Sequence, residues 1–238
     1  MLAFVFTIGC SRPTRLSLQD RNSEITYLDN VRETASCDPT AASSNRALPL
    51  FSKPFAGDFP VANMFDHDKP SVDYNGSVLT MCGARDANQV DGHDGYDWVM
   101  PEGTPIRAVA DGIVMFAGLN PPGYCAQLGR IVSAIEVQLR HRAPDGTGFS
   151  TLYGNLSSVR VVVGDVIPAG ATIGLSGNTG CSTAPHLHFS TYQDRGGSFI
   201  FIDPYGWHQT ASDPWEADPR GAASVWLWRD GEAPRFRF

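Results

Sequence analysis

Short runs of β-branched and aromatic residues recur along the middle of the chain. They occupy residues 106–110, 113–117, 131–139, 149–153, 159–163 and 187–192. Turn-forming pairs such as Asp111-Gly112, Asp145-Gly146 and Gly177-Asn178 separate them, which is typical of antiparallel strands. The same region lacks an apolar period long enough for a three-turn amphipathic helix. The pattern predicts a mainly β domain, an antiparallel sandwich or barrel-like hybrid, whose chemistry is carried on loops.

The last of these runs contains two histidines, in Thr183-Ala184-Pro185-His186-Leu187-His188-Phe189. Because side chains two residues apart leave the same face of a strand, His186 and His188 lie about 6.5 to 7 Å apart along the backbone and can reach one metal ion. The alternative is a pair of half-buried imidazoles without a ligand, and for an isolated HxH motif this alternative is the more common one.

A second cluster, His93-Asp94-Gly95-Tyr96-Asp97, contains an HxxxD motif. Alone it indicates only a solvated, glycine-rich loop. Together, however, the two clusters supply one carboxylate and two or three imidazoles to a single divalent ion. This is the ligand set of a catalytic zinc that keeps a position open for water, so the pair of motifs favours a metallohydrolase.

Around both clusters runs a longer pattern that resembles the lysostaphin/LytM-type (β-lytic) zinc metallopeptidases, which cut the peptide cross-links of bacterial murein. The matching blocks follow the family's order between about residues 92 and 204. They are Asp91-Gly92-His93-Asp94-Gly95-Tyr96-Asp97-Trp98, Pro101-Glu102-Gly103-Thr104-Pro105-Ile106, Ala108-Val109-Ala110-Asp111-Gly112-Ile113-Val114, Thr151-Leu152-Tyr153-Gly154-Asn155-Leu156-Ser157, Val163-Gly164-Asp165-Val166-Ile167-Pro168-Ala169-Gly170, Ile173-Gly174-Leu175-Ser176-Gly177-Asn178-Thr179-Gly180 and the HxH segment. The resemblance implies an antiparallel β-sandwich/barrel-sandwich hybrid with a zinc site on the floor of a groove.

The resemblance also implies roles for individual residues. His93, Asp97 and His188 correspond to the ligands of one Zn²⁺ per chain, and His186 to a histidine that acts on the zinc-activated water or on the developing oxyanion. A second such histidine normally stands in a Tyr-x-His-Leu segment. Here that segment reads Tyr153-Gly154-Asn155-Leu156, so Asn155 takes the place of the histidine.

Asn155 leaves two functions open. An amide can donate a hydrogen bond to an oxyanion, but it cannot accept and return a proton near neutral pH. Because general acid–base catalysis contributes about 10² to 10⁴-fold, the chain is either a zinc endopeptidase of peptidoglycan peptides that tolerates Asn155, or a weak or inactive relative. Such a relative would bind murein or activate another hydrolase. We expect His141, at the end of a strand-like run, to be a surface residue that does not compensate.

Four segments follow from these assignments. Residues 1–47 are an apolar start and tether, 48–90 a lead-in that packs on the core, 91–204 the metallopeptidase domain and 205–238 an aromatic extension. We expect the acids of Asp66-His67-Asp68 to be solvated rather than to bind metal. Aromatic rings of the extension could stack on sugars at the rim of a groove, but we expect most of them to cover the sheet.

The formal net charge of −7, without a Lys/Arg cluster, argues against nucleic-acid binding, and we expect a monomer. Residues 7–11, Thr-Ile-Gly-Cys-Ser, resemble a lipoprotein processing site, which predicts a lipid on Cys10 and attachment to a membrane of the cell envelope, in the periplasm or on the outer surface. The alternative is a mature N-terminus with a chance cysteine. Cys37, Cys82, Cys125 and Cys181 remain for two disulfides in an oxidising compartment, in any of three pairings, or for unpaired thiols.

Overall fold

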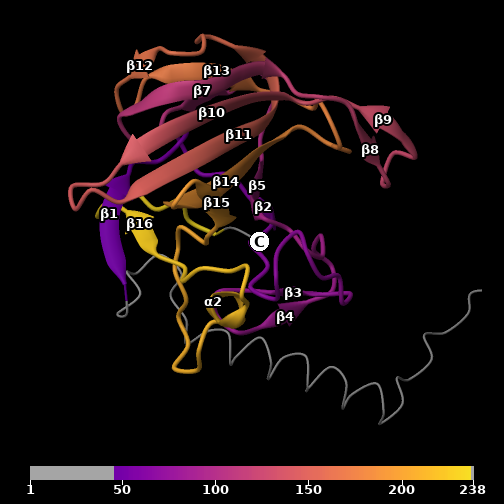
Figure 1. Cartoon of the computed structure of the whole chain (residues 1–238). Coiled ribbons are helices and arrows are strands. Elements are labelled where there is room, and N and C mark those ends of the chain that lie inside the picture. The colour runs from indigo at the N-terminus through magenta and orange to yellow at the C-terminus, as the bar shows by residue number, and fades with distance from the viewer. Residues whose placement is uncertain (1–45, 237–238) are drawn as a thin grey trace, which may run out of the picture. The chain divides into compact units, whose positions relative to one another are not determined.

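Antiparallel strands make up almost all the regular structure of the described residues, 46–236, in the computed structural model (Figure 1). These residues belong to one unit, Asp38–Phe238. The apolar start, nearly all of the predicted tether, Cys10, Cys37 and Phe238 lie outside the described residues. No helix among the described residues is long and apolar enough to span a membrane.

The largest sheet positions the site, and it does not close into a barrel. Its main path runs β12-β7-β10-β11-β14-β5-β2, and β13, β6 and β15 are attached to that path. In chain order the ten strands are β2 (Val61–Asn63), β5 (Gly95–Val99), β6 (Pro105–Arg107), β7 (Gly112–Leu119), β10 (Ile135–Arg142), β11 (Gly148–Val159), β12 (Val166–Ile167), β13 (Thr172–Ser176), β14 (His186–Arg195) and β15 (Ser198–Phe201).

The remaining elements are short. Two small hairpins pair β3 (Val78–Leu79) with β4 (Arg85–Asp86) and β8 (Gly123–Cys125) with β9 (Arg130–Val132). The only helix of the described residues is α2 (Pro214–Ala217), which Asp213 caps by accepting a hydrogen bond from the Trp215 amide. The mainly β, antiparallel fold expected from the hydrophobic pattern is confirmed.

One predicted strand is wrong. The β-branched run at 159–163 begins at the last residue of β11, and the chain then leaves the sheet. The Asp165 carboxylate accepts a hydrogen bond from the Val162 amide at 2.9 Å, and Gly164 has a φ of 95°. A side-chain turn of this kind competes with strand pairing, so Val162 and Val163 lie in a turn and remain exposed.

The two ends of the described chain meet in the core. β1 (Ala47–Phe51), which begins at the last residue of the predicted tether, pairs in parallel with β16 (Trp226–Trp228). The Phe51 ring lies 5.7 Å from Trp228 and 6.2 Å from Phe189 of β14. The aromatic extension therefore packs against the strand that carries the HxH motif.

Most rings of the extension are core residues, as expected. Tyr205, Trp215, Trp226 and Trp228 are buried, while Trp207 and Phe236 are partly buried. Each large aromatic side chain removes a large apolar area from water when buried, so the four buried rings stabilise the fold and are not available as a sugar-binding surface.

Candidate metal centre and groove

The pairing of β5 with β14 brings the two histidine motifs together. Asp97 lies directly opposite His188 in this antiparallel pair. Gly95 permits the close approach, because a Cβ atom on it would lie 2.2 Å from the carbonyl oxygen of Phe189 and 2.8 Å from Ser190 Oγ. His93 precedes β5 by two residues. The pairing of these two strands therefore places a carboxylate and two imidazoles at one point of the sheet. Because Asp97 lies in β5 and His188 in β14, the expectation that the chemistry is carried on loops is wrong for these two residues.

The three side chains converge tightly. His93 Nε2 lies 3.2 Å from His188 Nδ1 and 3.3 Å from Asp97 Oδ2, and His188 Nδ1 lies 2.9 Å from Asp97 Oδ1. One ligand atom from each residue falls within 4.8 Å of the others. This set of nitrogen and carboxylate donors matches that of three-ligand zinc sites.

Neighbouring groups orient both imidazoles. His93 Nδ1 donates to the carbonyl oxygen of Met64 at 3.1 Å, which leaves Nε2 to face the cluster. His188 Nε2 lies 2.8 Å from Ser190 Oγ and 3.3 Å from Asp94 Oδ1, so its Nδ1 faces the cluster instead. Metal-binding histidines usually donate their other ring N–H to a carbonyl, carboxylate or hydroxyl group in this way. The donor set therefore fits a divalent ion.

A residue outside both motifs holds the carboxylate ligand. Asn63, the last residue of β2, donates from Nδ2 to Asp97 Oδ2 at 2.7 Å. Its Oδ1 accepts a hydrogen bond from the Val90 amide at 2.9 Å, which fixes the orientation of the side-chain amide. The sequence motifs gave no indication of Asn63, because it lies in the lead-in, far from His93 and Asp97 along the chain.

The carboxylates of the cluster hold protons on its imidazoles. Burial lowers the pKa of His188, but the hydrogen bonds that its ring donates to the Asp94 and Asp97 carboxylates outweigh burial and raise that pKa to about 10. Burial likewise opposes ionisation of Asp97, yet the charge of His93 and the hydrogen bond with His188 hold the pKa of Asp97 well below its usual range. Two ionised carboxylates thus retain protons on the imidazoles when no metal is bound, and a metal ion has to displace those protons.

His186 lies beside this cluster and is half-buried. Its Nδ1 donates to the carbonyl oxygen of Ala184 at 2.8 Å, because a carbonyl can only accept. Its Nε2 lies 3.7 Å from Asp97 Oδ1, and in the neutral ring that carries its hydrogen on Nδ1 this Nε2 is a hydrogen-bond acceptor. In this tautomer His186 presents a proton acceptor to the same space that the three candidate ligands face.

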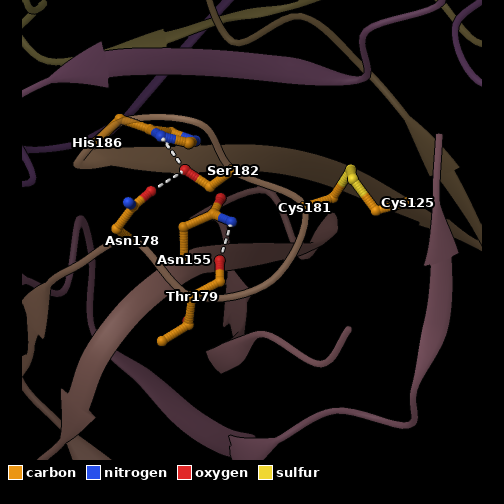
Figure 2. The surroundings of a disulfide bond; sticks show 7 residues. All are labelled: Cys125, Asn155, Asn178, Thr179, Cys181, Ser182 and His186. Atoms are coloured by element: carbon orange, nitrogen blue, oxygen red, sulfur yellow. Dashed lines mark hydrogen bonds between the residues drawn. A yellow bond between two sulfur atoms is a disulfide. The ribbon is translucent and has the colours of Figure 1, made fainter. Parts of the chain in front are cut away.

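Asn155 also reaches this space, but its amide is already engaged. It lies in β11, one residue after Gly154, which pairs with His188. Its Nδ2 donates to the Thr179 carbonyl oxygen at 2.6 Å (Figure 2). Its φ of 58° is in the left-handed region, which asparagine tolerates better than most residues. Asn155 therefore ties the loop before β14 to the sheet and keeps one N–H for another acceptor.

A groove of about 340 Å³ contains these groups. Its lining includes His93, Asp97, His188, His186, Asn155, Asn63, Gln127, Cys181 and Ser182. Imidazole, carboxylate and amide groups thus open onto one solvent-accessible space. The structure brings together every site residue that the sequence predicted within the described part of the chain; that His93, Asp97 and His188 bind zinc stays a prediction.

Two histidines outside the groove differ from expectation. His141 is buried rather than at the surface: Nδ1 donates to the Asp111 carbonyl oxygen and Nε2 lies 2.8 Å from Thr151 Oγ1. His67 and Asp66 are also buried, so the prediction of solvated acids in the Asp66-His67-Asp68 segment is wrong for Asp66. Partners distant in sequence, which no local pattern indicates, explain both results.

The partners of His67 are two carboxylates, Asp203 near the end of the predicted metallopeptidase domain and Asp213 of the aromatic extension. Its ring nitrogens lie 3.0 Å from Asp203 Oδ2 and 3.0 Å from Asp213 Oδ1. Burial lowers the pKa of His67, but the two carboxylates raise it to about 9. His67 uses both nitrogens in this contact, so it forms an ion triad that joins lead-in and extension.

A disulfide lies at the rim of the groove. Cys125, at the end of β8, is bonded to Cys181, in the loop before β14 (Figure 2). Cys82 is disulfide-bonded as well. The expectation of disulfides is thus confirmed for the three cysteines of the described residues. The predicted lipid on Cys10 remains untested.

Comparisons with known proteins match the part of the chain that contains this site. The model of peptidase family M23 matches residues 91–200. The glycyl-glycine endopeptidase ALE-1 of Staphylococcus capitis is 37% identical over 128 residues, which is 50% of this chain and 32% of the relative. The DD-carboxypeptidase/endopeptidase Mpg of Neisseria meningitidis is 40% identical over 97 residues, 41% of this chain and 19% of the relative. The chain therefore spans about a third or less of the length of these relatives.

Among solved structures, the catalytic domain of lysostaphin from Staphylococcus simulans is similar to this chain. The identity is 29% and the TM-score 0.41, and the match covers 61% of this chain and 89% of the lysostaphin domain.

Proposed function

We propose that this chain, whose residues 91–200 match the model of peptidase family M23, is a zinc-dependent endopeptidase that hydrolyses the peptide cross-links of bacterial peptidoglycan. One observation supports this proposal above the others. His93, Asp97 and His188 converge within 4.8 Å in an open groove, and the ring of His186 lines the same groove.

Zn²⁺ bound by these three residues would supply a Lewis acid that acidifies water and polarises a carbonyl group. The protein's own groups then handle orientation and protons. Met64 and Ser190 keep the ligand nitrogens of His93 and His188 directed at the ion, and Asn63 keeps Asp97 in place. His186 accepts a proton at Nε2 while Nδ1–H stays bound to the Ala184 carbonyl, and it can return that proton to a leaving amine.

The proposal is tested with purified, cross-linked peptidoglycan. Zinc-loaded protein is incubated with it, and the conversion of cross-linked muropeptide dimers to monomers is followed by chromatography. We expect conversion that is lost in His188→Ala and after chelation, and that is retained in the matched variant His208→Ala, which removes an imidazole outside the groove. Absence of conversion by protein shown to contain zinc would refute the enzymatic proposal.

A second function is favoured by Asn155. Its amide donates to Thr179, and no second imidazole takes its place in the groove lining. A chain that binds peptidoglycan but hydrolyses it very slowly, or that activates a separate hydrolase, is consistent with this arrangement. In the same experiment such a protein would sediment together with peptidoglycan but would release no muropeptide monomers.

The cleaved bond and the location belong to the proposal as well. The similar proteins are a glycyl-glycine endopeptidase and a DD-carboxypeptidase/endopeptidase, so synthetic pentaglycine and D-amino-acid cross-link peptides should be compared directly. We propose that the protein works as a monomer in the cell envelope, without binding nucleic acid, and that a lipid on Cys10 attaches it to a membrane. Mass spectrometry of the protein isolated from its own cells tests the lipid.

A further inference from the structure

The loop that precedes β14 contains a buried serine that no step of the proposed reaction uses. Ser182 is 7% exposed, although its neighbours Cys181, Thr183 and Ala184 are exposed. Figure 2 shows its hydroxyl between the side chains of Asn178 and His186. A buried hydroxyl in an otherwise exposed loop requires hydrogen-bond partners, and all of its partners lie around His186.

Three contacts meet at the Ser182 hydroxyl. Its Oγ lies 3.1 Å from His186 Nδ1, 2.9 Å from the Ala184 carbonyl oxygen and 2.5 Å from Asn178 Oδ1. The hydroxyl has one hydrogen, which it donates to Asn178 or Ala184, and its lone pairs accept from the Nδ1–H of His186. The imidazole N–H is therefore shared between Ser182 and Ala184.

These contacts lead to the proposal. We propose that Ser182 is a positioning residue for His186: it fixes the Nδ1–H tautomer and the ring plane, so that Nε2 stays free toward the groove. The Ala184 carbonyl alone is an insufficient restraint, because Ala184 is exposed and water competes for an exposed acceptor. A buried hydroxyl anchored on Asn178 has no such competitor. This inference rests on the proposed role of His186 as a proton acceptor.

The disulfide next to Ser182 holds the same loop in place. Cys181 is bonded to Cys125 of the β8–β9 hairpin, and Asn155 holds Thr179 of the loop from the other side. Residues 179 and 181 are thus fixed immediately before Ser182. Loss of the Cys125–Cys181 bond should free the loop and weaken the contact of Ser182 with His186.

The first test reads the tautomer itself and does not depend on activity. Protein with ¹⁵N-labelled histidine is loaded with Zn²⁺, and long-range ¹H–¹⁵N correlation spectra distinguish Nδ1–H from Nε2–H rings; the His186 signals are assigned by their loss in His186→Ala. We expect a single Nδ1–H form in the unmodified protein, a mixture with Nε2–H in Ser182→Ala, and recovery in Ser182→Thr, which keeps the hydroxyl. Thr183→Ala, beside it in the loop, is the matched control and should leave the spectrum unchanged.

The second test separates positioning from a loss of folding. On a soluble cross-link peptide, Ser182→Ala should lower kcat at least tenfold with KM changed less than threefold and zinc affinity unchanged, and Ser182→Thr should restore kcat. Cys125→Ser combined with Cys181→Ser should also lower kcat, and adding Ser182→Ala should then cost less than it does alone, because both changes act on one loop. If the fold-losses in kcat from Ser182→Ala and from the double cysteine variant multiply as independent effects do, the link to the disulfide is overturned.

The two proposals fail separately. If no variant hydrolyses the peptide although zinc is bound, the proposed function fails, and the spectra still decide the role of Ser182. If Ser182→Ala keeps His186 entirely in the Nδ1–H form, the positioning role is overturned, whatever the protein hydrolyses.

Discussion

Replacing Asn63 by alanine should weaken zinc binding although all three candidate ligands are retained. Asn63 donates to Asp97 Oδ2 at 2.7 Å, and Asp97 is 7% exposed, so water cannot easily replace the lost donor. The other partner of Asn63 is the backbone amide of Val90, an exposed residue, and this amide can form a hydrogen bond with water instead. The effect therefore falls on the carboxylate ligand.

The magnitude follows from the kind of hydrogen bond that is lost. A hydrogen bond to a charged group contributes about 1.5–3 kcal/mol, and 1.4 kcal/mol corresponds to about tenfold in affinity. Loss of the Asn63 contact should thus raise the Kd for Zn²⁺ by about 10- to 100-fold, the range usual for groups that orient a metal ligand.

The assay is a competition titration of zinc against a chromophoric chelator at fixed pH. Asn88→Ala is the matched control, because Asn88 is exposed and its side chain bonds only to Asp86. A Kd for Asn63→Ala within twofold of the unmodified protein, with an unchanged circular dichroism spectrum, would show that Asn63 does not hold the ligand and would refute the reasoning.

Three further predictions concern rate, packing and pH. Asn155→His should raise kcat on a cross-link peptide by at least tenfold, because it adds an imidazole to the groove; an unchanged kcat would mean that the missing histidine does not limit the rate. In urea titrations, Gly95→Ala should lower the free energy of unfolding by at least about 1–3 kcal/mol, since its Cβ would lie 2.2 Å from the Phe189 carbonyl oxygen. Gly123→Ala, which has open space around it, should leave the free energy of unfolding almost unchanged. The pKa of His67 is raised from 6.5 to about 9, so protonated His67 contributes about 3 kcal/mol to the free energy of unfolding below pH 6.5, and this contribution is lost as the pH rises through 9. In urea titrations of zinc-loaded protein, His67→Gln should therefore lose less stability between pH 6 and pH 9.5 than the unmodified protein does.

Local pattern was sufficient for the fold class, whereas the assembly of the histidine motifs was predicted from the two motifs taken together and from the family resemblance. Because side chains alternate between the two faces of a strand, the HxH motif predicts that His186 and His188 share a face. The structure confirms that both residues lie in one strand, β14. HxxxD taken alone indicated a solvated loop, whereas Asp97 lies in β5 and is buried. What a strand residue faces depends on its neighbour across the sheet, and that neighbour, β14, lies far along the chain.

The groups that orient the ligands could not be predicted from the sequence. Asn63 and Met64 sit in the lead-in, and nothing in their own segment distinguishes them from other residues near a short strand. His141 and Asp66 were misplaced for the same reason: their burial is set by Thr151 and by the Leu79 and Gly92 amides, through contacts that follow from tertiary packing. Asp94 and Ser182, by contrast, lie one and four residues from His93 and His186, so proximity alone could have raised them as candidates.

The parallel pairing of β1 with β16 has a practical consequence for anyone who expresses this protein in pieces. The family match ends at residue 200, yet Phe51 and Trp228 pack on the strand that carries His188, and Asn63 and Met64 hold its partner ligands. A recombinant fragment cut at the family boundaries would expose that apolar surface and lack both supports. The autonomous folding unit is thus larger than the evolutionary module, and shuffling residues 91–200 alone into another scaffold should yield an insoluble or metal-free product.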